Sequence, residues 1–138
     1  MMEKVYIDTN IFLNPILYDV NTNQDANKSK NFLEKIITNK IAGFTSVLTW
    51  DEFIWIIRKT LGIHIAIEKG KKFLIFPNLK LVKLSLTTIN RAQDLISNYH
   101  IQPRDAIHAA SALENKINKI ISFDNDFDII DEIEREEP

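Results

Sequence analysis

The sequence predicts an α/β domain in which a parallel sheet is covered by helices on both faces. Short apolar runs alternate along the chain with longer segments whose apolar residues have helical spacing, and this alternation is typical of such a sheet. The chain has 138 residues, 45% of them hydrophobic, which suffices for one core. We therefore expect a single domain over residues 1–138 without a linker.

Four apolar runs have the composition of buried parallel strands, being rich in Ile, Val, Leu and Phe. They cover residues 5–7, 41–45, 79–84 and 119–123. Five segments between and beside them have helical spacing. They cover residues 29–39, 47–61, 63–76, 87–99 and 103–118, with Gly62 separating the second from the third. The Asn-rich segment 21–27 is expected to be a mobile loop.

The composition excludes several kinds of site. The chain has no cysteine, which rules out a disulfide framework, a thiolate nucleophile and a sulfur-ligated zinc site. The histidines His64, His100 and His108 lack metal-ligand spacing, and His108 is expected at the surface. The N-terminus lacks a leader pattern and no window resembles a membrane span, so we expect a soluble cytoplasmic protein with no membrane partner.

Charge is spread unevenly along the chain. The net charge of -2 argues against a protein whose whole surface binds nucleic acid. Residues 28–72 nevertheless carry nine Lys or Arg against four acids, while residues 124–138 carry eight acids against Arg135 alone. A local basic surface for a phosphate backbone is one interpretation, and ordinary solvated helix positions are the other. The candidates are Arg58, Lys59, Lys69, Lys71 and Lys72.

Polar side chains follow the first and the last predicted strand. Asp8, Thr9 and Asn10 come directly after residues 5–7, and the segment 124–126 (Asp-Asn-Asp) follows the last strand. In a sheet of this kind, ligands bind outside the carboxyl ends of the strands. The two strand ends are therefore expected to share one site, although Asn10 could also cap the next helix.

Two more acids lie on predicted helices. Asp105 is near a helix start marked by Pro103, where the helix dipole favours a carboxylate. Glu52 lies opposite the main apolar stripe of its helix, among Leu48, Trp55 and Ile56. That second apolar face needs a cover, so Glu52 is expected in a partly apolar cleft or beside a subunit interface.

The acids indicate a metal site only when they are considered together. Each one alone is more typical of a helix cap or a solvated surface. Several carboxylates at one edge repel one another unless a cation lies among them, and oxygen ligands without His or Cys suit Mg²⁺ or Mn²⁺. We expect Asp8, Asp105 and Asp124 to hold the metal, with Glu52 orienting a water, accepting its proton or holding a second ion.

Four segments in order resemble the PIN-domain nucleases, and especially the small VapC-type toxins. These segments are YIDTNIFLN, SVLTWDEFIWIIRK, RDAIHAASAL and IISFDNDFD, and together they span essentially the whole chain. The resemblance implies a three-layer PIN-like fold with four or five parallel strands, the last of them short, degraded or replaced by the acidic tail. It also implies an RNA substrate, a small antitoxin partner and a homodimer.

By the same resemblance, the catalytic acids are Asp8, Glu52, Asp105 and Asp124, and they bind Mg²⁺ or Mn²⁺. The supporting positions are Asn10, Ser122 and Asp126. Thr9 and Asn10 are expected to position the loop or a phosphate oxygen, and Arg104 to touch substrate.

Two other functions compete with a metal-dependent ribonuclease. A non-catalytic RNA-binding or scaffold module with a PIN-like fold is disfavoured because all four acid positions are filled. A phosphoacceptor signalling domain would need a lysine after a late strand, where this chain has Asp124.

Overall fold

The structure, a computed structural model, describes residues 2–138 and contains one sheet of five parallel strands. The strand order across the sheet is β3-β2-β1-β4-β5. The strands are β1 (Lys4–Ile7), β2 (Ala42–Ser46), β3 (Leu79–Val82), β4 (Lys119–Ile121) and β5 (Glu134–Glu136). The predicted parallel sheet is confirmed, and the four predicted strands begin and end within two residues of the observed ones.

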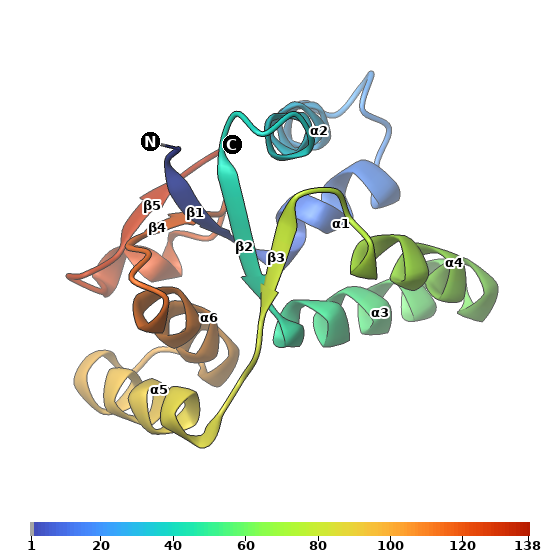
Figure 1. Ribbon diagram of the computed structural model, residues 1–138. Helices are drawn as coiled ribbons and strands as arrows, with labels where there is room; N and C mark the ends of the chain where they lie inside the picture. The colour runs from blue at the N-terminus through green and yellow to red at the C-terminus, as the bar shows by residue number, and fades with distance from the viewer. Residues whose placement is uncertain (1) are drawn as a thin grey trace.

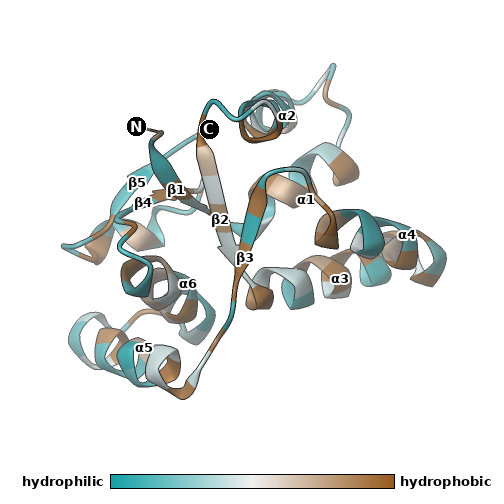
Figure 2. Ribbon diagram, viewed as in Figure 1, coloured by the Kyte–Doolittle hydropathy of each residue, from teal (hydrophilic) through white to brown (hydrophobic). Residues whose placement is uncertain are grey.

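Helices cover both faces of the sheet, which confirms the predicted three layers (Figure 1). Along β1, Val5 and Ile7 pack with the first four helices, whereas Tyr6 points to the opposite face and packs with the last two. The helices are α1 (Thr9–Leu17), α2 (Gln24–Ile37), α3 (Val47–Leu61), α4 (Ile63–Leu74), α5 (Leu86–Tyr99) and α6 (Pro103–Glu114), followed by a 3-10 helix, η1 (Asn125–Ile129). Hydrophobic and hydrophilic residues alternate along α3 to α6, as expected for helices with a buried side (Figure 2).

Helix α1 is missing from the predicted elements. Its buried residues Ile11, Phe12 and Leu13 are consecutive, so they lack clear helical spacing, and Pro15 lies inside the helix. The prediction of a mobile loop over residues 21–27 was wrong for its second half, because α2 begins at Gln24. Asn23 caps α2, its side chain accepting a hydrogen bond from the Ala26 N–H at 2.9 Å.

Strand β5 is the last strand, which the sequence predicted to be short, degraded or replaced by the acidic tail. It has three residues, Glu-Arg-Glu, and pairs in parallel with β4 so that Arg135 lies opposite Ile120. Arg135 also donates to Asp128 in η1 at 2.8 Å and to the Ser122 carbonyl at 3.1 Å. These contacts tie the edge strand to the segment that follows β4.

The strand order marks the carboxyl end of β1 as the place where an open parallel sheet forms its ligand crevice. The chain builds β2 and β3 on one side of β1 and places β4 and β5 on the other, so the order reverses between β1 and β4. Ligand sites of open parallel sheets lie outside the carboxyl ends of the strands at such a reversal. Among residues 2–138, no helix has the length and apolar composition that a membrane crossing requires.

Candidate active site

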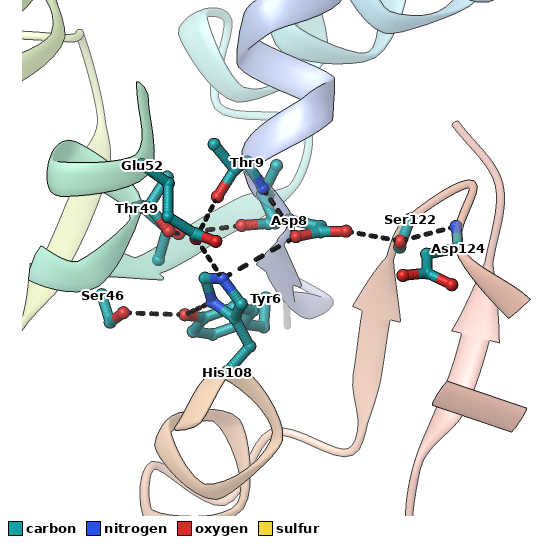
Figure 3. A network of polar contacts seen from close by, with 11 residues as sticks. Tyr6, Asp8, Thr9, Ser46, Thr49, Glu52, His108, Ser122 and Asp124 are labelled. Carbon is teal, nitrogen blue, oxygen red and sulfur yellow. Dashed lines mark hydrogen bonds and ion pairs between the residues drawn. The ribbon is translucent and has the colours of Figure 1, made fainter. Parts of the chain in front are cut away.

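Asp8 lies at the carboxyl end of β1, where it is also the N-cap residue of α1. Its side chain is almost fully buried and both carboxylate oxygens accept hydrogen bonds. Oδ1 accepts from the Thr9 N–H at 2.8 Å, and Oδ2 accepts from the Ser122 hydroxyl at 2.7 Å (Figure 3). The second bond joins the ends of β1 and β4.

Ser122 links Asp8 to the acids that follow β4. Its Oγ accepts a hydrogen bond from the Asp124 N–H at 2.9 Å while its hydroxyl donates to Asp8. The Asp124 carboxylate in turn accepts from the Asp126 N–H at 2.9 Å and begins η1. One buried hydroxyl therefore sets the position of the turn that carries Asp124 and Asp126.

Three carboxylates form a compact group beside the carboxyl end of β4. Oxygens of Asp105, Asp124 and Asp126 lie within 4.8 Å of one another, although the three residues come from two separate segments. Asp105 lies in the first turn of α6, beside the end of β4. The sequence predicted Asp8 as a ligand together with Asp105 and Asp124, and Asp126 as a supporting residue. Asp8 lies next to this group, joined to it through Ser122.

The pKa of Asp105 is shifted by its surroundings. Burial, together with the neighbouring charges of Asp124 and Asp8, raises the pKa of this carboxyl to about 6. A carboxyl held near other carboxylates in this way is stabilised in its ionised form by a cation. A set of oxygen donors without nitrogen or sulfur fits Mg²⁺ or Mn²⁺.

Glu52 of α3 reaches the site from the other side of Asp8. Its Oε1 accepts from the Thr9 hydroxyl at 2.8 Å and lies 2.6 Å from His108 Nε2. Burial raises the pKa of Glu52, but hydrogen bonds from His108 and Thr9 and the charge of Arg104 outweigh burial and lower it. Glu52 was expected in a partly apolar cleft or beside a subunit interface; at the carboxylate itself, its neighbours are the hydrogen-bonding groups of Thr9 and His108.

The prediction that His108 lies at the surface was wrong, since its side chain is 1% exposed. Helix α6 packs between the sheet and α5, so nearly all its sides are buried. Nδ1 of His108 lies 2.6 Å from the Tyr6 hydroxyl oxygen, and the Tyr6 hydroxyl donates to Ser46 Oγ at 2.9 Å (Figure 3). The run of small residues after His108 was the available signal, because a helix made of Ala and Ser can be covered all round.

The remaining predicted residues take different places. Asn10 is exposed and lies inside α1, so the expectation that it caps this helix was wrong; Asp8 is the cap. Thr9 is buried and its hydroxyl donates a hydrogen bond to Glu52.

The predicted basic residues lie on α3, α4 and α6. Arg104 is exposed at the start of α6. The basic candidates lie on α3 and α4, where Lys72 pairs with Glu68 at 3.2 Å.

The chain is similar to proteins of one family. It is 27% identical over 143 aligned positions to ribonuclease VapC2 of Methanocaldococcus jannaschii, covering 95% of this chain and 91% of that protein. Its fold is similar to VapBC2 from Rickettsia felis bound to a promoter DNA fragment, with a TM-score of 0.75, 18% identity, and 97% and 98% of the two chains covered.

A second solved structure has the same fold. Mycobacterium tuberculosis VapC20, described as a Sarcin-Ricin loop cleaving toxin, matches with a TM-score of 0.76, 14% identity, and 97% and 99% of the two chains covered. The sequence pattern of the PIN domain matches residues 5–133. This range includes the four acids Asp8, Glu52, Asp105 and Asp124. The chain therefore belongs to the PIN domain family.

Proposed function

We propose that this protein is a metal-dependent endoribonuclease that hydrolyses RNA phosphodiester bonds and is the toxin of a toxin–antitoxin pair. The observation that carries the proposal is the meeting of acids from β1, α3, α6 and the end of β4 at one crevice. Membership of the PIN domain family and the similarity to a VapC ribonuclease support it. The solved relatives that contain toxin–antitoxin complexes support a small antitoxin partner.

In this proposal Asp8, Asp105 and Asp124 hold Mg²⁺ or Mn²⁺, and Asp126 lies close enough to share the site. The bound ion would polarise the scissile phosphate and lower the pKa of a water molecule. Ser122 and the Thr9 N–H hold the Asp8 carboxylate in position by donating to both its oxygens.

Glu52 is the proton acceptor in this proposal. Within residues 2–138 its side-chain hydrogen bonds all end on Oε1, which leaves Oε2 able to orient the attacking water and take its proton. The Thr9 hydroxyl is committed to Glu52, so Thr9 positions this carboxylate and does not bind a phosphate oxygen.

The test is a cleavage assay on defined RNAs with Mg²⁺, with Mn²⁺ and with a chelator. The parent and the control Asp94→Asn, which changes an exposed acid on α5, should cleave with either metal. The cleavage rate of Asp8→Asn should fall by at least about 100-fold, because removing a metal ligand, or a residue that orients one, typically lowers activity by about that factor. Cleavage that persists in chelator would contradict the metal, and RNA binding without cleavage would favour the non-catalytic module.

Calorimetric titration of Mn²⁺ tests the metal site without substrate. Because metal competes with protons for Asp105, whose pKa is about 6, Mn²⁺ affinity should fall when the pH is lowered toward that value. Mn²⁺ should bind more tightly than Mg²⁺. Binding that Asp8→Asn leaves unchanged would remove Asp8 from the ligand set.

A further inference from the structure

His108 is a buried polar residue behind the acids for which the proposed mechanism has no use. It is 1% exposed, and both of its ring nitrogens have partners at 2.6 Å: Tyr6 at Nδ1 and Glu52 at Nε2. We propose that His108, held by Tyr6, is a positioning residue that fixes Glu52 through Oε1 and leaves Oε2 free for the reaction. This inference rests on the proposed function, because it assigns a role within the same site.

The geometry defines the direction of the ring. A histidine bonded at one nitrogen can still swing about that bond, whereas partners at both nitrogens leave a single orientation. The ring also packs edge-on against Tyr6, with centroids 5.6 Å apart and planes at 63°. The Nε2–H is therefore aimed at Glu52, where Thr9 supplies a second donor to the same oxygen at 2.8 Å.

The chain of contacts joins the elements that carry the acids. It runs from Ser46, the N-cap residue of α3, through Tyr6 of β1 and His108 of α6 to Glu52 in the second turn of α3. Ser46 makes no side-chain capping bond to its own helix, and its hydroxyl oxygen is instead the partner of Tyr6. Any shift of α3 relative to α6 would break the network at Glu52.

A purely structural role fits these observations less well. Burying an imidazole and a phenol needs hydrogen bonds merely to offset the lost hydration, and the net stabilisation from such bonds is small. The network also ends on a carboxylate that keeps 16% of its side chain exposed at the crevice, and not on a buried partner. A network that positions a reactive group is expected to have this arrangement, in which the supporting side chains are rigid and buried and only the reactive side chain is accessible.

Two amide substitutions separate the two ring nitrogens. His108→Gln can place an N–H near the Nε2 position and keep the bond to Glu52, whereas His108→Asn reaches only as far as Nδ1. His108→Asn should lower kcat by about 10- to 100-fold with little change in KM, as for partners that orient a metal-site group. His108→Gln should keep most of the activity. The control His64→Asn makes the same change at an exposed site on α4.

A double-variant cycle tests whether His108 acts through Glu52. In a Glu52→Ala background, adding His108→Asn should lower the residual kcat no further, since the group to be positioned is gone. A structural histidine predicts instead that the full loss is repeated in that background. That result, or equal losses for His108→Gln and His108→Asn, would overturn the proposal.

Proton NMR of the metal-free protein gives a readout that needs no activity. The buried His108 ring should show slowly exchanging N–H signals, identified by their loss in His108→Gln. Glu52→Ala should shift or remove the Nε2–H signal, and Tyr6→Phe should perturb the ring signals from the other side. An Nε2–H signal unchanged by Glu52→Ala would overturn the positioning contact. If no RNA is cleaved but the signals respond as expected, the proposed function fails while the contact stands.

Discussion

Two carboxyl side chains of the crevice are driven in opposite directions by their immediate neighbours. Asp105 lies among other acids, and burial with the charges of Asp124 and Asp8 raises its pKa to about 6. Burial also raises the pKa of Glu52, but the donors His108 and Thr9 outweigh burial and lower it. The same chemical group thus favours its neutral form at one position and its ionised form at the other. Neutralising each group should therefore have opposite effects on stability.

Asp105→Asn should raise the melting temperature of the metal-free protein near neutral pH. With a folded-state pKa of about 6 against an ordinary value of 3.8, folded Asp105 keeps its proton where the unfolded chain has lost it. That stabilisation is present at low pH and is lost as the pH rises through about 6. Thermal unfolding should show a gain at about pH 7.5 and almost none at about pH 4. An equal gain at both, or a loss at the higher pH, would contradict this acidity.

Glu52→Gln should lower the melting temperature near neutral pH. Because the folded-state pKa is lowered, ionised Glu52 stabilises the fold above its unfolded-state pKa. This contribution is lost as the pH falls through the folded-state value, so the difference between variant and parent should shrink in acid. Circular dichroism melts across that range measure it. A variant as stable as the parent at neutral pH would show that His108 and Thr9 do not favour the carboxylate.

At the scale of elements, the close approach of α2 to the sheet depends on Gly43 in β2. A Cβ at this position would lie 2.9 Å from Ile36 Cδ1 and 3.1 Å from Ile7 Cδ1, and both isoleucines are fully buried. Gly43→Ala should destabilise the protein by about 1–3 kcal/mol, the usual cost of an extra methyl group in a packed core. The chain-entropy gain of losing a glycine, up to about 1 kcal/mol, is smaller. Urea unfolding gives the difference.

A second substitution tests whether Ile36 is the source of that cost. Ile36→Val removes the nearest methyl group and should alone cost about 0.5–1.5 kcal/mol. Combined with Gly43→Ala, it should give a loss smaller than the sum of the two single losses. Strict additivity would show that the added methyl group meets something other than Ile36.

At the scale of the whole molecule, α3 has an apolar side that the single chain leaves partly uncovered. The sequence predicts that Leu48, Trp55 and Ile56 are covered by α4 or by a second copy of the chain. Helix α4 packs along α3, yet Trp55 remains 58% exposed with Lys59 Nζ 4.9 Å above its ring. The second copy therefore stays a prediction.

Sedimentation of Trp55→Lys against the parent tests this second copy. The parent should sediment as a dimer and Trp55→Lys as a monomer, because a lysine cannot be buried in an apolar contact at low cost. The control Tyr18→Lys replaces another exposed aromatic residue, at the end of α1, and should remain a dimer. A parent that is monomeric at high concentration would remove the dimer prediction.

Local sequence patterns determined most of the architecture. Alternation of apolar runs with helical spacing predicted the parallel sheet and five of the six α-helices, because the direction of side chains along an element depends only on its own period. Helix α1 was missed where Ile11, Phe12 and Leu13 stand together without a period. The candidate acids were chosen from local features too, namely their positions after strands, near a helix start or opposite an apolar stripe, and their catalytic role stays a prediction.

Only the tertiary structure decided how those acids are held. A local pattern tells which side of an element is apolar, but not which element covers the other side. The sequence therefore predicted His108 at the surface. In the structure, α6 packs against both the sheet and α5, and the two ring nitrogens of His108 contact Tyr6 and Glu52. The hydrogen bond from Ser122 to Asp8 joins residues 114 positions apart, and no pattern within one segment can report such a contact.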